Sequence, residues 1–415
     1  MRVVVLGGGV VGVTTAYYLA RDGAEVELVE GADAIGTDAT AGNAGLIAPG
    51  HSFAWASPRA PAMLARSLLG KQTAIQVRLR PDPELVRWGL RFLRECTADR
   101  ARRNTLVKLR LCRYSQQQLD RLAADEQIDY LDGHGGILYL YRDARELELG
   151  AVKMQLLADH GQEIRVLDAA GVVDVDPVFA PVQDRIAGAV YGPTDGSGNA
   201  QVFAQRVADA CERLGARIRL STTVRALRAE GDRITGVVTD DGALDADVYI
   251  LALGVGSAAV ARSVGVRLSI YPAKGYTANF PILDGNAPTV GGVDEELLVA
   301  WAPLGGKLRM TSTAEFAGYD RTAKEASFGN IMRLARELFP DAADYSAGER
   351  RACLRPMTPD GPPVIGRGRR YANLFFNTGH GHMGWTMACG SSRAVADLIQ
   401  GRTPELDLTG MEYRW

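Results

Sequence analysis

Long apolar runs are missing from the sequence. Although 47% of the 415 residues are hydrophobic, no stretch approaches the roughly eighteen apolar residues that indicate a membrane-spanning helix. The first apolar run, Val3 to Leu6, ends in three glycines and is too short for the core of a secretory signal. Internal repeats and low-complexity tracts are also lacking. We therefore expect a globular, cytoplasmic protein, with peripheral attachment at the inner face of the membrane left open.

Cysteine pairs and net charge are scarce as well. The cysteines stand at positions 96, 112, 211, 353 and 389, and no two of them form a C-x-x-C pair. We therefore expect no disulfide framework, no metal site and a reducing compartment. A formal net charge of -2 leaves no overall basic excess for a nucleic-acid partner. The length exceeds what one hydrophobic core supports and predicts two domains.

The N-terminus carries a glycine pattern between two expected strands. Strand 2–6 leads into a helix, and strand 25–29 follows that helix. Gly7, Gly9 and Gly12 form G-x-G-x-x-G at the start of the helix. The first glycine permits a tight turn, the second lets the backbone approach a pyrophosphate, and the third lets helix and strand pack closely. This βαβ unit predicts a dinucleotide-binding site.

The residues around the glycines support the same prediction. Val10 and Val11 begin the helix, where N–H groups and the positive end of the helix dipole suit phosphate groups. Glu30 ends the second strand, where its carboxylate is placed to accept a hydrogen bond from a ribose hydroxyl. The unit therefore predicts an adenine dinucleotide, either NAD or FAD.

The loop after Glu30 favours FAD. An NAD-binding domain continues its parallel sheet at this point, whereas residues 37–45 are rich in small residues that suit a backbone pressed against a flat ring. An exposed flexible loop is the alternative. The loop residues that we expect to bind the cofactor are Thr40, Ala41, Gly42, Asn43, Ala44 and Gly45. Further cofactor-binding residues are expected at Leu46, Val224 and Gly254.

Four motifs resemble those of a known family. They are T-A-G-N-A-G at 40–45 with A-P-G at 48–50, Y-P-A-K-G-Y at 271–276, L-R-P-M-T-P-D-G at 354–361, and the glycine-rich stretch 379–390. In these motifs the chain resembles the FAD-dependent D-amino-acid dehydrogenases, within the wider group of D-amino-acid and glycine oxidases. The resemblance covers nearly the whole chain.

The resemblance implies a fold that combines α/β and α+β parts. It implies a discontinuous Rossmann-type FAD-binding domain, which we place at residues 1–60, 165–262 and 346–415. A second domain with a mixed or antiparallel sheet, which would bind the substrate, is expected over 61–164 and 263–345. The two domains would share one active site.

The resemblance also implies a reaction. A hydride would pass from the α carbon of a D-amino acid to non-covalently bound FAD, giving an imino acid and then a 2-oxo acid. The electrons would pass on to a quinone or another acceptor that is not oxygen. An oxygen-using oxidase, a D-proline or hydroxyproline type of dehydrogenase, an NAD-dependent dehydrogenase and a non-catalytic flavoprotein stay open as alternatives. The preferred amino acid and the oligomeric state are not determined by the sequence.

Glycines precede the last expected helix, 385–399. Backbone N–H groups and a helix dipole at this point would stabilise the negative charge of reduced flavin near its pyrimidine edge. A glycine-rich cap of a packed helix is the alternative. The residues concerned are Gly379, Gly381, His382, Met383 and Gly384.

Arg355 is the expected ligand of the substrate carboxylate. The proline after it restricts its backbone to extended conformations, so that its side chain is well aimed. A guanidinium group binds a carboxylate through two parallel hydrogen bonds, and the resemblance places the carboxylate-binding arginine at this position. A solvated surface arginine is the alternative.

The motif at 271–276 supplies three further candidates. Strand alternation puts Lys274 and Tyr276 on one face and Tyr271 and Gly275 on the other, so they cannot all point into one pocket. We expect Tyr276 to be a second donor to the carboxylate. Ordinary strand positions are the alternative for each of them.

His51 and His382 are the histidines nearest the segments expected to face the flavin. We expect them to line the pocket, since hydride transfer requires only that the substrate amine be neutral and orientation supplies most of the rate. An obligatory general base is the less favoured interpretation. His382 also replaces a smaller residue expected from the resemblance, which leaves the shape of the pocket open.

A basic stretch runs from Arg78 to Arg121. It holds twelve Arg or Lys against five Asp or Glu, a net of +7. With its apolar residues it is able to contact an anionic lipid surface, and an amphipathic helix packed on the substrate domain is the favoured alternative. The apolar residues are Leu85, Val86, Trp88, Leu90, Phe92 and Leu93.

Overall fold

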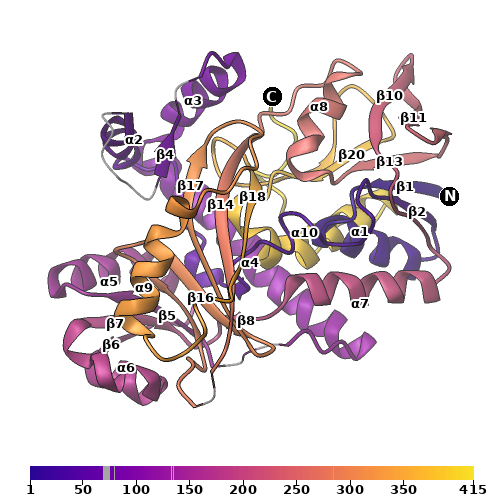
Figure 1. The fold of residues 1–415 in the computed structure, drawn as a ribbon. Coiled ribbons are helices and arrows are strands. Elements are labelled where there is room, and N and C mark those ends of the chain that lie inside the picture. Colours follow the sequence, from indigo (N-terminus) through magenta and orange to yellow (C-terminus); the bar gives the residue numbers. More distant parts are fainter. Residues whose placement is uncertain (69–74, 79, 132, 134, 284) are drawn as a thin grey trace.

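The computed structural model describes residues 1–415 except 69–74, 79, 132, 134 and 284. Two large sheets organise the chain (Figure 1). One contains the N-terminal strands, the other is a larger mixed sheet, and helices pack against both. This combination confirms the predicted mixture of α/β and α+β parts.

Six strands of the described residues form the first sheet. Their order is β19 (Val364–Arg367), β20 (Leu374–Thr378), β13 (Val248–Leu251), β1 (Arg2–Leu6), β2 (Glu25–Val29) and β9 (Arg217–Arg219). All neighbours run parallel except β19 and β20. Helix α1 (Val10–Arg21) connects β1 to β2, as the alternation of the sequence predicts.

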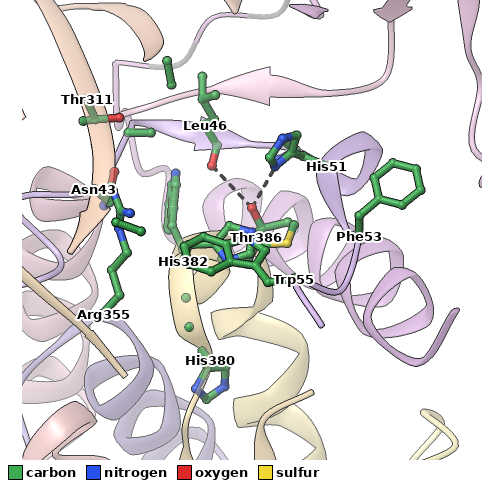
Figure 2. Close-up of a pocket in the computed structure, with 18 of the residues that line it drawn as sticks. Asn43, Leu46, His51, Phe53, Trp55, Thr311, Arg355, His380, His382 and Thr386 are labelled. Carbon is green, nitrogen blue, oxygen red and sulfur yellow. Dashed lines mark hydrogen bonds between the residues drawn. The ribbon is translucent and has the colours of Figure 1, made fainter. Parts of the chain in front are cut away.

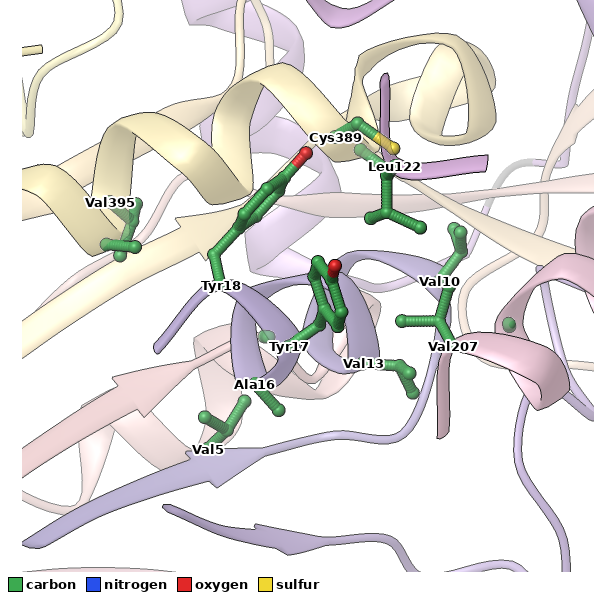
Figure 3. Packing of buried hydrophobic residues seen from close by; sticks show 14 of the residues in the cluster. Val5, Val10, Val13, Ala16, Tyr17, Tyr18, Leu122, Val207, Cys389 and Val395 are labelled. Atoms are coloured by element: carbon green, nitrogen blue, oxygen red, sulfur yellow. The ribbon is translucent and has the colours of Figure 1, made fainter. Parts of the chain in front are cut away.

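The core of this part surrounds α1. Because α1 is apolar on nearly every side, it is buried between other helices rather than lying at the surface. Figure 3 shows Tyr17 and Tyr18 of α1 close to Leu122, Val207 and Cys389. These three residues belong to α4 (Ala98–Glu126), α7 (Ala200–Arg213) and α10 (Gly384–Ile399).

A small antiparallel sheet covers the other face of the parallel sheet. It consists of β10 (Val224–Glu230), β11 (Arg233–Thr239) and β12 (Gly242–Leu244). Leu227 and Val237 pack there in one cluster with Tyr249 of β13. The helices η3 (Gly254–Gly256) and α8 (Ser257–Arg262) follow β13.

The second sheet holds nine strands of the described residues. Their order is β18 (Glu349–Met357), β14 (Tyr271–Pro281), β17 (Lys307–Phe316), β16 (Val299–Leu304), β15 (Gly291–Asp294), β5 (Ile137–Tyr141), β7 (Gly188–Gly192) and β6 (Arg165–Asp168), with β4 (Ile75–Val77) beside β17. Most neighbours are antiparallel, whereas β5 with β15 and β4 with β17 are parallel. The predicted mixed sheet is therefore present.

Helices cover this sheet from both sides. Trp301 of β16 packs with Phe179 and Phe339 in a buried aromatic cluster. That side is covered by α6 (Ala169–Val175), η2 (Pro177–Arg185), η4 (Glu325–Phe328) and α9 (Gly329–Leu338). Helix α5 (Ala144–Ala158) packs against β5 and β7 through Met154 and Leu157.

The strand pairing divides the chain differently from the expected domain boundaries. Strands β6 and β7 belong to the second sheet, although residues 165–262 were expected in the cofactor domain. Strand β18 also joins the second sheet, through β14. Helix α4, expected in the substrate domain, packs against α10 in the core around α1. β7 joins the sheet through β5, β18 joins it through β14, and α4 packs on α10, so each assignment depends on a contact between distant segments that local patterns do not specify.

The remaining elements surround the space between the sheets or project from them. They are β3 (Leu46–Ile47) paired with β8 (Gly196–Ser197), η1 (Pro49–His51), α2 (Ala60–Leu68), α3 (Pro83–Glu95) and η5 (Gly381–Met383). Among the described residues, no helix combines the length and the apolar character needed to cross a membrane.

Candidate functional site

A cavity of ≈ 1410 Å³ lies between the two sheets. Its wall contains the glycine turn after β1, the loop at 36–46, and the segment between β20 and α10. Residues of β17 and β18 contribute from the second sheet. Residues from both parts of the fold therefore meet around one space.

The glycine turn has the geometry that its sequence predicts. Gly7 has a φ of +113°, and a Cβ added to it would lie 2.5 Å from the carbonyl oxygen of Ala252. A Cβ on Gly12 would lie 1.8 Å from the carbonyl oxygen of Gly7. At Gly9 the nearest atom would be Thr40 Oγ1, at 3.4 Å. The outer glycines thus permit the turn and the close packing, and the middle one presents bare backbone to the cavity.

The loop at 40–45 is held against the start of α1 and against the second sheet. The Val10 N–H donates to Thr40 Oγ1 at 3.0 Å. Asn43 donates through Nδ2 to the Thr40 carbonyl, and the Gly45 N–H donates to Asn43 Oδ1, each at 2.6 Å. A Cβ on Gly42 would lie 2.9 Å from the Cβ of Cys353, which explains the need for small residues here.

Most of the predicted cofactor-binding residues line this cavity. Those in its wall are Gly7, Gly9, Val10, Val11, Glu30, Thr40, Gly42, Asn43, Ala44, Leu46, Gly254, Gly379, Gly381, His382, Met383 and Gly384. Gly12 lies beneath the turn, Ala41 and Gly45 are buried within the loop, and Val224 begins β10, so these four lie outside the wall. For all of these residues, contact with a cofactor stays a prediction.

The segment between β20 and α10 turns through two glycines. Gly379 and Gly381 have φ values of +81° and +61°, which favour glycine. This turn directs η5 and the first residues of α10 along the cavity wall. The N-terminal end of α10, the helix predicted over 385–399, therefore faces the cavity.

Arg355 lies in the cavity wall on β18. Its pairing partner is Ala273 of β14, and its guanidinium group lies over Gly275, where an added Cβ would be 2.4 Å from Nη2. Figure 2 shows Arg355 beside Asn43 and Thr311 at one side of the pocket. Burial lowers the pKa of the guanidinium group, although it is still a strong base. Gly275 makes the space that this side chain occupies.

Tyr276 and Lys274 do not face the cavity, and the prediction that Tyr276 binds the carboxylate is wrong. The hydroxyl of Tyr276 donates to Glu315, and Lys274 Nζ lies 3.2 Å from the same carboxylate. Tyr271, on the opposite face, donates to Asp82 Oδ2 at 2.7 Å and packs in an aromatic cluster outside the cavity wall. All three are buried. Tyr276 joins β14 to β17 within the second sheet, whereas Lys274, through Asp320, and Tyr271, through Asp82, connect the sheet to neighbouring segments.

Both predicted histidines line the cavity and contact each other. The rings of His51 and His382 meet edge to face, with centroids 6.0 Å apart, and Trp55 stacks on His382 at 4.8 Å. Burial holds the pKa of His382 well below its usual value, so its ring is neutral at physiological pH. His51 Nε2 lies 3.6 Å from Glu295. This cluster forms the side of the pocket across from Arg355 (Figure 2).

Trp55, Glu295 and Thr311 also line the cavity, although sequence reasoning did not identify them. Trp55 follows the A-P-G motif by five residues, so an aromatic residue in a loop near that motif was the available signal. Glu295 and Thr311 lie in segments without a local motif. Only the pairing of distant strands brings them to the cavity.

Comparison with known proteins agrees with this geometry. Residues 2–398 match the family described as FAD dependent oxidoreductase. The chain is 45% identical over 415 residues to D-amino acid dehydrogenase 2 of Mesorhizobium japonicum, with 100% of both chains covered. It is 41% identical over 408 residues to the D-amino acid dehydrogenase of Methylobacterium radiotolerans, with 98% of this chain and 97% of the relative covered.

Solved structures show the same fold at lower identity. Glycine oxidase from Geobacillus kaustophilus superposes with a TM-score of 0.78 at 22% identity, covering 100% of this chain and 98% of that chain. L-Proline dehydrogenase from P. horikoshii gives 0.75 at 18% identity, covering 99% and 96%. These likenesses concern the fold alone. On its sequence match over almost its whole length, the chain belongs to the FAD dependent oxidoreductase family.

Proposed function

We propose that the protein is a D-amino acid dehydrogenase, which oxidises D-amino acids to imino acids that water converts into 2-oxo acids. The observation that carries the proposal is the partly buried Arg355, which shares one cavity with the dinucleotide-binding turn. The relatives named D-amino acid dehydrogenase support the choice of substrate. An amino-acid substrate needs both a cation for its carboxylate and an electron acceptor for its α carbon, and this cavity offers a place for each.

The residues of the cavity fit FAD. The start of α1, with the bare backbone of Gly9, would hold the pyrophosphate, and Glu30 would hold the ribose. The segment from Gly381 to Gly384 would lie against the flavin. Bound FAD supplies an acceptor for a hydride. The chain itself binds, orients and excludes water from the reacting groups.

The carboxylate of the substrate would pair with Arg355 and so fix the position of the α carbon. A carboxylate that enters this cavity loses water, and the guanidinium group replaces that water with two charge-assisted hydrogen bonds. His382 is a poor proton acceptor at neutral pH because burial disfavours the charged imidazolium form that would result. The substrate amine therefore has to arrive neutral, and orientation supplies most of the rate.

A screen of D- and L-amino acids tests this proposal. Turnover would be followed with an artificial dye acceptor, with oxygen uptake measured in parallel. We expect dye reduction with D-amino acids and little oxygen uptake. Dye reduction by L-enantiomers alone would contradict the proposed substrate, and stoichiometric peroxide would identify an oxidase instead.

Glu30→Ala is expected to weaken FAD binding by about 1 to 3 kcal/mol, because a ribose hydroxyl would lose its acceptor. The carboxylate of Glu30 also accepts hydrogen bonds from the Gly8 and Ala32 N–H groups, at 2.6 and 2.8 Å, so its position is fixed. Titration of FAD into the apoprotein, followed by flavin fluorescence, measures the effect. Glu30→Gln retains an acceptor, so its FAD affinity is expected to lie between those of the parent and Glu30→Ala. An unchanged FAD affinity in Glu30→Ala would show that Glu30 does not contact the cofactor.

The electron acceptor that we propose is a quinone. Two exposed apolar residues of α5, Leu149 and Val152, belong to the cavity wall, with exposed fractions of 40% and 74%. They add apolar surface to a part of the wall that also carries Glu146 and Lys153. An apolar quinone ring would lose water on entering there, which favours its binding over that of a charged acceptor.

We propose that the face of α3 formed by Val86, Leu90 and Leu93 contacts an anionic lipid surface. The other face of α3 packs through Trp88 and Phe92, so the helix is amphipathic, as the alternative interpretation held. The three apolar residues are nevertheless 59%, 55% and 47% exposed. Exposed arginines at positions 87 and 94 accompany them, which suits negatively charged headgroups.

Replacing Val86, Leu90 and Leu93 by serine is expected to lower the affinity for vesicles with anionic lipid by at least about tenfold, because apolar burial and charge attraction act together. Co-sedimentation with vesicles at low and high salt measures this. Val166→Ser is the control, since Val166 is 57% exposed on β6. Dye-linked activity should stay unchanged in both variants. Equal vesicle binding by the serine variant would show that α3 does not contact lipid.

A further inference from the structure

A buried carboxylate lies behind the histidine cluster. Asp195 follows β7, is 3% exposed and does not belong to the described cavity wall. It accepts hydrogen bonds from the hydroxyl of Tyr139 at 2.6 Å, from Nε2 of Gln162 at 3.0 Å and from the Gly50 N–H at 3.2 Å. These donors come from three separate segments, so one carboxylate connects β5, η1 and the chain after α5.

Two of these donors determine where His51 lies. Gly50 directly precedes His51 in η1, and a Cβ on Gly50 would lie 2.5 Å from Asp195 Oδ2, so only glycine lets the backbone reach the carboxylate. The ring of Tyr139 stacks on the His51 ring, with centroids 5.7 Å apart and planes 11° apart. Asp195 thus holds both the backbone at His51 and the ring on which His51 rests.

We propose that Asp195 is a positioning residue, which fixes His51, and through it the wall shared with His382, against the bound substrate. The proposal rests on the proposed function, since it takes this wall to contact the amino acid. Asp195 itself would touch neither substrate nor cofactor. Its contribution should therefore appear mainly in KM.

The protonation of Asp195 gives this role a pH dependence. Burial raises the pKa of its carboxyl to about 7, although Tyr139, Gly50 and Gln162 favour the charged form. A carboxylate accepts from all three donors, whereas a protonated carboxyl has to donate one hydrogen itself. Since the pKa is raised, the neutral form prevails below about pH 7 and the positioning contacts are complete only above it. We therefore expect KM to rise as the pH falls through about 7.

The other titratable groups around Asp195 are Tyr139, Cys112 and Lys108, with His51 and Glu295 on the far side of the Tyr139 ring. Burial raises the pKa of Glu295, but the hydrogen bond and the attraction to His51 lower it overall, so Glu295 stays charged. Burial raises the pKa of Tyr139 well above its usual value, and that of Cys112 on α4 to about 12, so both stay neutral. Burial lowers the pKa of Lys108, which interacts with Cys112, to about 8. The substrate amine titrates in both parent and variant, so the difference between the two pH profiles reports Asp195 together with the groups that it contacts.

The test uses Asp195→Asn in the FAD-loaded enzyme. We expect KM for a D-amino acid to rise about tenfold at pH 8, with kcat changed less than about threefold, and the step near pH 7 to disappear. Tyr139→Phe keeps the stacked ring but loses the hydroxyl, so it should show a smaller rise in KM. It replaces Asp195→Asn as the test variant if Asp195→Asn folds poorly. Asp176→Asn is the matched control, because Asp176 is a buried carboxylate that accepts from the N–H groups of Val178, Thr289 and Val290.

A double variant and a readout without turnover complete the test. If Asp195 acts through His51, then Asp195→Asn should raise KM little further in a His51→Gln background. The imidazole proton resonances of His51, in histidine-labelled protein without substrate, should move in Asp195→Asn and not in Asp176→Asn, since they lie over the Tyr139 ring. Additive effects on KM or unmoved resonances would overturn the proposal. Moved resonances in a protein that oxidises no D-amino acid would contradict the proposed function alone.

Discussion

Arg355→Ala is expected to lower kcat/KM for a D-amino acid by about 10² to 10⁴. Removing one partner of a buried ion pair costs roughly 3 to 5 kcal/mol, because the remaining charge stays without water and without a counter-charge. Most of the loss should appear as a raised KM, and a smaller part as slower flavin reduction from misalignment. Steady-state kinetics with a dye acceptor and stopped-flow absorbance separate the two.

Two further variants make the test of Arg355 specific. Arg355→Lys keeps the charge but loses the paired donors, so its kcat/KM should lie between those of the parent and Arg355→Ala. Gly275→Ala keeps the arginine but places a Cβ 2.4 Å from its Nη2, which should displace the guanidinium group and raise KM. FAD content should stay normal in all three. A parental KM and rate in Arg355→Ala would mean that the carboxylate is bound elsewhere.

Gly12→Ala is expected to abolish stable FAD binding. The added Cβ would lie 1.8 Å from the carbonyl oxygen of Gly7, an atom of the backbone that cannot rotate away. Helix α1 would have to move from β1, and overpacking of this kind costs about 1 to 3 kcal/mol or more. We expect purified Gly12→Ala to lose most of its flavin absorbance and to melt at a lower temperature.

The control for Gly12 is a glycine in open space. An added Cβ on Gly89 of α3 meets no atom within 4 Å and its φ is not positive, so Gly89→Ala should keep its flavin and gain slightly in stability. A Gly12→Ala protein with normal flavin content and a normal melting temperature would contradict the close packing of α1 on β1.

Local sequence patterns predicted the cofactor side of the molecule well. The turn through Gly7 and Gly12, with Glu30 at the end of β2, depends on contacts within about thirty residues, and each step has a residue-specific signal. The helix after Gly384 has similar signals. In both places, residues that lie close together in the sequence also lie close together in the structure.

The orientation of β14 shows what alternation leaves open. A period of two separates Tyr276 from Gly275, but it does not say which of the two faces meets the cavity. That is decided by β18, since Arg355 lies opposite Ala273 and so shares a face with Gly275. If Arg355 faces the cavity, Tyr276 therefore faces away from it. This conclusion requires the register of two strands that lie about eighty residues apart in the sequence.

Contacts over long sequence distances account for the other differences. Asp195 reaches Gly50 across 145 residues and Tyr139 across 56, and no pattern near any of them indicates this network. The two helices of the basic stretch likewise have different surroundings: α4 packs in the core around α1, whereas α3 exposes its apolar face. Such assignments follow from tertiary packing and not from local composition.

The most direct measurement is the absorbance of the purified protein under anaerobic conditions. The protein should be yellow, show flavin bands, and release intact FAD on denaturation, because the cavity is expected to hold FAD without a covalent bond. Addition of a D-amino acid should bleach these bands, its L-enantiomer should not, and oxygen should restore the colour only slowly. A colourless protein that retains NAD, or a flavin bleached by the L-enantiomer alone, would contradict the account.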